Sequence, residues 1–191
     1  MKKILVAYAS MAGSTAEVAQ AVGEELQQGG LQVDVKPLDA VGDLMGYDGV
    51  VVGAPMIMGW QRAARRFLRR HRGELQGKPL AVFVLAMSLT QTGETSIDGV
   101  PAVVDPQLPK TPVTPGKLTF RERYATLSNY LQPILKAARP AKPLSIGVFG
   151  GRMEYGRLKW WAVLFAMLIV KAPAGEKRDW EAIRGWARGL G

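Results

Sequence analysis

Residues 3–15 read KILVAYASMAGST, and this stretch decides the fold. Lys3–Ala9 is a continuous apolar run, typical of a parallel strand that is buried on both faces. The loop Ser10-Met11-Ala12-Gly13-Ser14-Thr15 follows, and Thr15–Gln28 then carries apolar residues at helical spacing. In open α/β sheets, ligands bind beyond the carboxyl ends of the strands, where such loops converge. The stretch therefore predicts a strand, a binding loop and a helix in succession.

Strands and helices alternate along the rest of the chain. The further predicted strands are Gln32–Leu38, Gly49–Gly53, Leu80–Ala86 and Leu144–Phe149. The further predicted helices are Gln61–Arg72, one that opens at the capping-box pattern Thr119–Glu122 and bends at Pro133, Trp160–Val170, and Asp179–Leu190. This order predicts one α/β domain over residues 1–191, a doubly wound sheet of five parallel strands with helices on both faces.

One long segment falls outside this alternation. Residues 88–118, after the fourth predicted strand, hold five prolines and show no sustained period. An insert of this kind in a domain is usually a functional lid or a disordered segment.

Composition limits the chemistry. The 191 residues include no cysteine and one histidine, His71, which excludes disulfides, thiolate catalysis, cysteine-held metal clusters and a two-histidine metal site. Any redox chemistry therefore has to come from a bound organic cofactor. The formal net charge of +9 predicts an anionic partner or surface.

The first loop has the residues that a phosphate needs. A helix N-terminus offers unpaired N–H groups and a positive dipole end, Gly13 lets the backbone approach a ligand closely, and Ser10, Ser14 and Thr15 add hydroxyl donors. The loop resembles the first loop of the flavodoxin family, roughly Ser/Thr-x-Thr-Gly-x-Thr, with Ala12 in place of a hydroxyl residue. That resemblance implies FMN. The alternative is a simple serine/threonine helix cap.

Two further loops resemble the segments that line the isoalloxazine ring in this family. The first is Ala54-Pro55-Met56-Ile57-Met58-Gly59-Trp60, whose methionines and indole suit a flat heteroaromatic ring. The alternative is that Met56 and Met58 fill core gaps and Trp60 begins the next helix. The second loop is Met87-Ser88-Leu89, which follows the fourth predicted strand.

The C-terminal part narrows the resemblance. Phe149–Trp161, the apolar helix after it, and Asp179-Trp180-Glu181 resemble the menaquinone-dependent protoporphyrinogen oxidases, flavodoxin-like flavoproteins with an extra loop after the fourth strand. The resemblance implies a quinone or other redox partner and a porphyrin substrate. The arginines of Gln61–Arg72 would then face porphyrin propionates or anionic lipid headgroups, and the alternative is a solvated helix face.

Three functions stay open at this point. An FMN-dependent oxidoreductase is favoured over a non-enzymatic electron carrier for an acidic partner, and over a binding module that has lost the flavin. Nucleic-acid binding is not expected, because no stacking aromatic and basic array is visible. We expect a cytoplasmic protein, with peripheral contact at the inner membrane face as the variant, through Trp160, Trp161 and Phe165 if these are not core.

Overall fold

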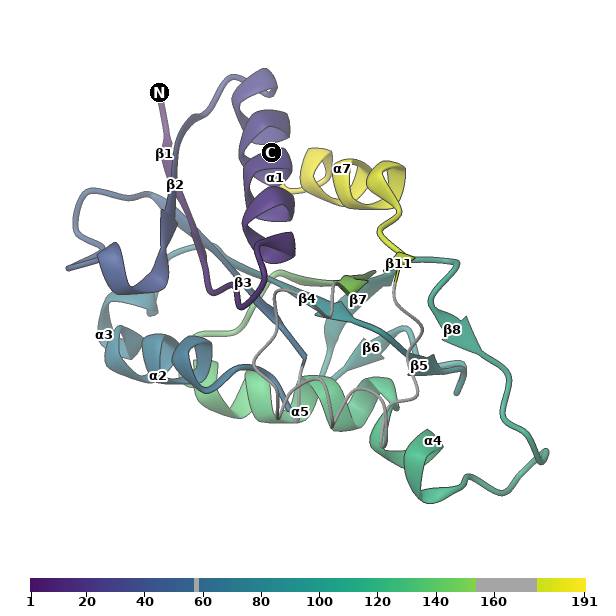
Figure 1. Ribbon diagram of the computed structural model, residues 1–191. Helices are drawn as coiled ribbons and strands as arrows, with labels where there is room; N and C mark the ends of the chain where they lie inside the picture. Colours follow the sequence, from purple (N-terminus) through teal and green to yellow (C-terminus); the bar gives the residue numbers. More distant parts are fainter. Residues whose placement is uncertain (57–58, 154–174) are drawn as a thin grey trace.

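Five parallel strands form the centre of the structure, and the insert adds two more at one edge (Figure 1). The computed structural model describes residues 1–56, 59–153 and 175–191. The strand order is β2-β1-β3-β4-β9-β7-β6, and only β6 runs antiparallel to its neighbour. The bounds are β1 Lys3–Tyr8, β2 Gln32–Pro37, β3 Gly49–Pro55, β4 Leu80–Ala86, β6 Ser96–Ile97, β7 Val100–Val104 and β9 Ser145–Gly150.

Helices cover both faces of this sheet. One face carries α1 (Ser14–Gln28) and α7 (Trp180–Arg188). The other carries α2 (Arg62–Arg70), α3 (Arg72–Leu75) and α5 (Leu127–Ala138), and α4 (Phe120–Tyr124) extends beyond the end of α5 (Figure 1). The remaining elements are η1 Leu38–Ala40 and two small pairs, β5 Leu89–Thr90 with β8 Pro109–Lys110 and β10 Arg152–Met153 with β11 Gly175–Glu176.

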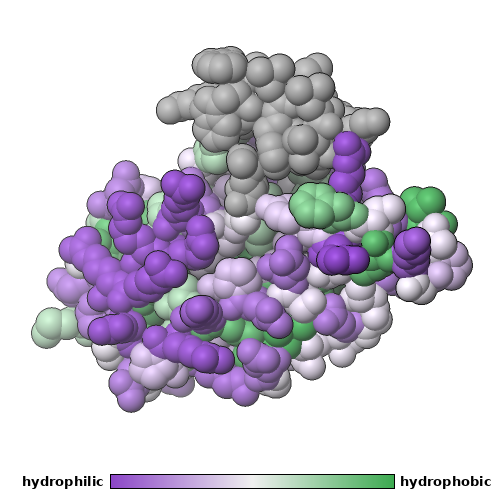
Figure 2. Space-filling model, turned by 90° about the horizontal axis from the view of Figure 1, so that it is seen from below, coloured by the Kyte–Doolittle hydropathy of each residue, from purple (hydrophilic) through white to green (hydrophobic). Residues whose placement is uncertain are grey.

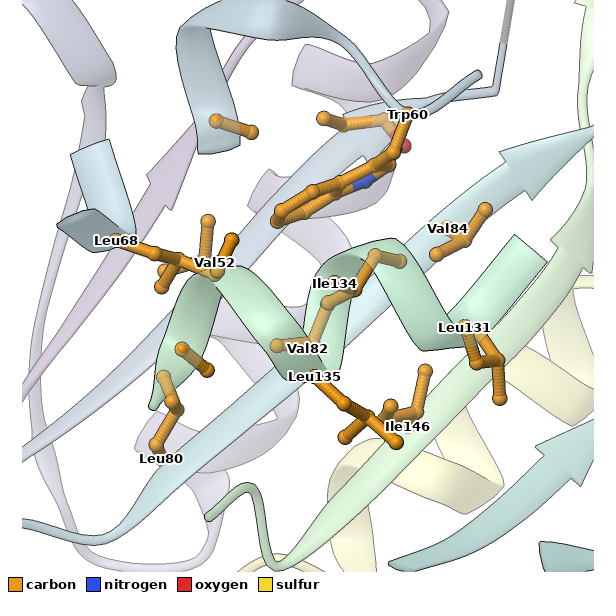
Figure 3. Packing of buried hydrophobic residues seen from close by; sticks show 14 of the residues in the cluster. Val52, Trp60, Leu68, Leu80, Val82, Val84, Leu131, Ile134, Leu135 and Ile146 are labelled. Atoms are coloured by element: carbon orange, nitrogen blue, oxygen red, sulfur yellow. The ribbon is translucent and has the colours of Figure 1, made fainter. Parts of the chain in front are cut away.

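The core lies in two layers because the central strands are apolar on both faces. Every residue of β3 and β4 is buried. The larger cluster packs the sheet against α2 and α5, where Val82, Ile134 and Leu131 meet (Figure 3). The second cluster packs α1 and α7 against the opposite face, around Phe83 and Trp186. The predicted α/β class, parallel sheet and two-sided helical cover are therefore confirmed.

The insert is more ordered than its sequence predicted. Within residues 88–118 the chain forms β5 to β8, and β7 lies parallel to β9, with Ala102 opposite Ile146. The β7 residues alternate between buried and more exposed, as an edge strand requires. Pro101 is tolerated there because it pairs only within the short β6–β7 hairpin at the sheet edge. The strands are too short, and too interrupted by proline, to give a readable period.

Two predicted helices are divided. The Thr119–Glu122 capping box is present, but α4 ends at Tyr124, and the hydroxyl of Thr126 caps a second helix, α5. Pro133 lies inside α5 and does not mark the break. The predicted Gln61–Arg72 helix likewise ends at Arg70, before α3. The predicted Trp160–Val170 helix, with Trp160, Trp161 and Phe165, lies outside the described residues.

Candidate functional site

The first loop has the geometry of an anion cradle. Gly13 has a φ of +92° at the N-terminus of α1, a backbone conformation that favours glycine. The Ser10 hydroxyl accepts the Gly13 N–H at 2.9 Å, and the Ala9 N–H ties the loop to the Gly53 carbonyl at 2.9 Å. Within the described part of the chain, no acceptor takes the N–H groups of the next three residues. These are Ser14, Thr15 and Ala16.

These free N–H groups are the feature that suits a phosphate. They lie in the first turn of a helix of 15 residues, where the helix dipole also favours a negative charge. Met11 and Ala12 are half-buried in the same loop. Thr15 is buried, so its side chain belongs to the wall of the cradle and not to its open side.

The second loop is shared between the core and the site. Met56 remains in register with β4 through its N–H, which donates to the Leu85 carbonyl at 2.8 Å, and it pairs with Trp60 across the loop. Gly59 has a φ of +94°. Ile57 and Met58 lie outside the described residues. The strand therefore continues to Pro55, beyond the predicted end at Gly53, and Met56 and Gly59 follow its carboxyl end.

Trp60 itself belongs to the core. Its side chain is 2% exposed, packs among Val52, Leu68 and Ile134, and donates its indole N–H to the Ala54 carbonyl at 3.3 Å (Figure 3). Ala54 is fully buried as well. Both side chains therefore lie in the core, a position that neither the flavin interpretation nor its alternative gave them, and α2 begins only at Arg62. An indole whose N–H is satisfied inside the protein packs better there than at the surface.

The third loop is held by α5 and by the end of α4. The phenol of Tyr130 on α5 donates to the Ser88 carbonyl at 2.9 Å, and the Thr90 N–H donates to the Ala125 carbonyl at 2.8 Å. Leu89 is buried in the core, whereas Met87 and Ser88 are half-buried. Of the three predicted residues, Met87 and Ser88 are therefore the ones left near the carboxyl edge of the sheet.

Two tyrosines that sequence reasoning did not select lie beside these loops. The Gly59 N–H lies against the phenolic oxygen of Tyr124. The rings of Tyr124 and Tyr130 pack edge to face, with 6.4 Å between the ring centroids. Burial raises the pKa of Tyr124, with the Gly59 N–H acting in the opposite sense, and burial also raises the pKa of Tyr130. Both phenols therefore stay neutral at physiological pH. The capping box predicted a helix over this segment, but no local sequence pattern predicted that its tyrosines would lie beside these loops.

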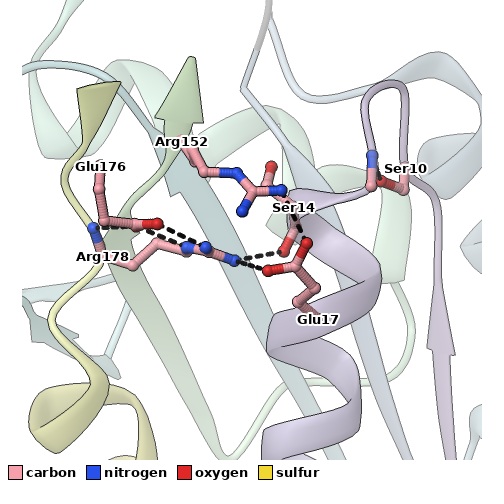
Figure 4. A network of polar contacts seen from close by, with 7 residues as sticks. Ser10, Ser14, Glu17, Arg152, Glu176 and Arg178 are labelled. Carbon is pink, nitrogen blue, oxygen red and sulfur yellow. Dashed lines mark hydrogen bonds and ion pairs between the residues drawn. The ribbon is translucent and has the colours of Figure 1, made fainter. Parts of the chain in front are cut away.

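A second group that sequence reasoning missed lies at the first turn of α1. Arg178 donates to Glu17 at 2.8 Å and to Glu176 at 2.5 Å, and Arg152 donates to Glu17 at 2.8 Å (Figure 4). Hydrogen bonding from Arg178 is the main reason that the pKa values of Glu17 and Glu176 are lowered. The Arg178 guanidinium also lies 3.5 Å from the Ser14 carbonyl. This network fixes the C-terminal strands against the helix that carries the candidate phosphate site.

The end of β9 brings these parts together. A side chain at Gly150 would overlap the Lys177 carbonyl, so glycine is required where β9 passes beneath the C-terminal segment. The fully buried Asp105 carboxylate accepts the Gly150 N–H at 3.1 Å, and the Gly151 N–H donates to the Ala86 carbonyl at 3.0 Å. Because the strands are parallel, all the candidate loops open at one edge of the sheet.

Other chemistries find less support in the described ranges. No cluster of three potential metal ligands occurs among the described residues. His71 is 2% exposed, with its Nδ1 2.7 Å from Glu74 on α3, and its ring packs against Phe67. Among the described helices, none is long and apolar enough to cross a membrane.

The chain is similar to a family model, to a curated relative and to solved structures. The model of the flavodoxin domain family matches residues 5–179. The protoporphyrinogen IX dehydrogenase [quinone] of Escherichia coli strain K12 is 23% identical over 97% of this chain and 93% of its own length. A flavodoxin of Streptococcus pneumoniae TIGR4 is 16% identical, with a TM-score of 0.48 over 98% of this chain and 97% of that one. The rubredoxin oxygen:oxidoreductase of Desulfovibrio gigas has a TM-score of 0.48 and 15% identity, over 90% of this chain but only 36% of its own.

Proposed function

We propose that this chain, which belongs to the flavodoxin domain family, is an FMN-dependent oxidoreductase that takes electrons from a porphyrinogen and passes them to a quinone. Membership of the family gives FMN as the cofactor and electron transfer as the general activity. The observation that carries the proposal is the row of N–H groups at the N-terminus of α1 that have no acceptor among the described residues, next to Gly13, at the carboxyl end of the first strand.

The residues present fit FMN. Ser10 to Thr15 would hold its phosphate through backbone N–H groups and the hydroxyls of Ser10 and Ser14. Backbone at Pro55, Met56 and Gly59, together with Met87 and Ser88, would flank the isoalloxazine ring. When bound, the flavin supplies the ability to accept and release electrons, which none of the protein's own side chains provides.

The protein's own contribution is binding and shielding. Tyr124 and Tyr130 keep their protons at physiological pH, so they present neutral donors and ring faces next to the Gly59 and Ser88 loops. Arg178 and Glu17 hold the first turn of α1 in place, so that its N–H groups stay aligned. These residues are positioning residues, since none has been placed in contact with a substrate.

Support for a porphyrinogen as electron donor and a quinone as acceptor comes from a relative and from the charge of the chain. The Escherichia coli relative matched over 97% of this chain is named as a protoporphyrinogen IX dehydrogenase that uses a quinone. The positive charge of this chain also suits a porphyrinogen, which carries carboxylate groups, or an anionic membrane surface. Contact with such a surface and a cytoplasmic location are parts of this proposal.

A flavin titration tests the cofactor site. We expect the purified protein to show flavin absorption bands with a perturbed shape, alone or after FMN is added. Gly13→Ala should weaken FMN binding, because it places a side chain at a φ of +92° in the cradle. The matched control is Gly30→Ala, at a φ of +85° beyond the other end of α1, with the same backbone penalty and no effect on FMN. Equal FMN affinity in both variants would contradict the site.

Turnover separates the enzyme from the second candidate, a non-enzymatic carrier for an acidic redox partner, which the charge of the chain also favours. FMN-loaded protein is mixed with a porphyrinogen and a water-soluble quinone, and porphyrin fluorescence is followed. Catalytic formation of porphyrin supports the enzyme. No turnover, together with fast, salt-sensitive reduction of an acidic electron-transfer protein, would establish the carrier instead.

A further inference from the structure

Charge is divided unevenly between the two helical layers. The layer formed by α2, α3, α4 and α5 holds nine basic and two acidic side chains, a net charge of +7 out of the +9 of the chain. The basic residues are Arg62, Arg65, Arg66, Arg69, Arg70, Arg72, Arg121, Arg123 and Lys136. The opposite layer, α1 and α7, holds four glutamates and two arginines, a net charge of −2. We call the first layer the basic layer.

Both acidic residues of the basic layer already interact with groups other than its arginines. Glu74 pairs with His71 and accepts the Leu44 N–H at 2.7 Å. Glu122 accepts the N–H groups of Val113 and Thr119, each at 2.7 Å. Across the described ranges no carboxylate lies within ion-pair distance of any arginine on α2. Hydrophilic side chains accordingly crowd the surface over α2 and α3 (Figure 2).

Two large apolar side chains stand at the other end of this layer. Val113 and Phe120 are each 84% exposed. Glu122 holds them near each other, because its carboxylate bonds the backbone of Val113 and of Thr119, the residue before Phe120. We call Val113 and Phe120 the apolar tip. Lys117 and Arg123, both exposed, belong to the same short segment, so the tip has a basic border.

The apolar tip adjoins the candidate flavin site. Phe120 and Tyr124 are four residues apart on α4, and therefore lie on the same side of that helix. Tyr124 in turn touches Gly59 of the loop expected to flank the flavin ring. Any surface that takes up the apolar tip thus lies close to the site where electrons would be exchanged.

We propose that the basic layer and the apolar tip together form a docking surface for an anionic lipid membrane. The arginines of α2, which have no ion-pair partner among the described residues, suit a surface of many phosphate groups. Long basic side chains beside an exposed aromatic ring are the usual composition of membrane-interface elements. An acidic protein would match the charge but leave Phe120 and Val113 without an apolar phase. The proposal rests on the proposed quinone-linked function for its purpose, since quinones dissolve in lipid, but lipid binding itself is measured separately.

Vesicle sedimentation tests the docking surface. FMN-loaded full-length protein is mixed with phosphatidylcholine vesicles, with and without phosphatidylglycerol. We expect binding only to the anionic vesicles, with release at high salt. Phe120→Ser should bind about tenfold more weakly, since it removes one exposed aromatic side chain from the interface. The triple variant Arg66→Gln, Arg69→Gln, Arg70→Gln should lose more than that.

Two control variants make the result specific. Leu144→Ser removes an apolar side chain that is 61% exposed just before β9, and Lys2→Gln removes an exposed charge at the N-terminus, so both should bind like the unchanged protein. No binding to anionic vesicles, or equal binding to neutral ones, would overturn the proposal. Loss of binding in the arginine variant with full binding in Phe120→Ser would also overturn it, because the contact with the vesicles would then be purely electrostatic and would not use the apolar tip.

The two proposals fail in different ways. Turnover with a water-soluble quinone in a protein that ignores vesicles would remove the docking surface and leave the oxidoreductase. Tight, Phe120-dependent binding to anionic vesicles without any turnover would leave the docking surface and remove the oxidoreductase.

Discussion

Replacing Arg178 with methionine removes the charge at the centre of the polar network in Figure 4 while keeping most of the aliphatic volume. The Arg178 side chain is 3% exposed and bonds Glu17, Glu176 and the Ser14 carbonyl. Its guanidinium also lies 4.6 Å from the centre of the Trp180 ring. The variant therefore loses several contacts of one almost buried cation at once.

The size of the loss follows from the exposure of the partners. Truncating one member of a fully buried ion pair costs about 3–5 kcal/mol. Here the two glutamate side chains are 44% and 46% exposed, so water can solvate them in the variant, and about 2 kcal/mol is the better figure. Loss of the contact with Trp180 adds about 0.5 kcal/mol. We expect Arg178→Met to lower the free energy of unfolding by about 2–3 kcal/mol at neutral pH.

The pH dependence tests the cause. The pKa values of Glu17 and Glu176 are lowered in the folded protein, mainly by hydrogen bonds from Arg178. A carboxyl with a lowered folded pKa stabilises the protein above its unfolded pKa, about 4.3, and this contribution is lost as the pH falls through the folded pKa. The difference between the unchanged protein and Arg178→Met should therefore shrink below about pH 4.

Urea unfolding at a series of pH values measures this difference. Arg188→Met is the matched control, because Arg188 also pairs with glutamates but its side chain is 52% exposed, and its loss should have a much smaller effect. An equal effect of both variants at neutral pH would refute the reasoning. So would a difference for Arg178→Met that stays constant from neutral to acid pH.

Three further variants probe the loops around the site. Tyr130→Phe leaves the Ser88 carbonyl without its donor and should cost about 1 kcal/mol in urea unfolding, and a stability equal to that of the unchanged protein would contradict the bond. Asp105→Ala removes the acceptor of two backbone N–H groups, so it should lower the free energy of unfolding by about 2–3 kcal/mol and weaken FMN binding in the flavin titration. Unchanged FMN affinity would show that the end of β9 does not contribute to the site. Trp60→Phe loses the bond to the Ala54 carbonyl and should cost about 1–2 kcal/mol with little effect on FMN, and a large loss of FMN affinity at normal stability would contradict its core role.

Sequence alone predicted the parts of the fold that depend on local burial. Leu80–Ala86 is apolar at every position because it is buried on both faces, and the predicted bounds agree with β4. The loop before α1 was equally readable, since Gly13 is required by its own backbone conformation and the free N–H groups follow from the start of a helix. Family membership supports FMN, whereas the residues predicted to hold it remain predictions.

The tertiary structure decided where side chains go once the elements have formed. Trp60 lies in a loop that sequence assigned to the flavin, yet its ring is buried in the core cluster between the sheet, α2 and α5. Arg178 reaches Glu17 across more than 160 positions, and no local pattern encodes such a pair. The edge strand Val100–Val104 exists because β9 offers it an unpaired edge. The spacing of apolar residues encodes which face of a single element is buried, whereas these contacts depend on which elements become neighbours.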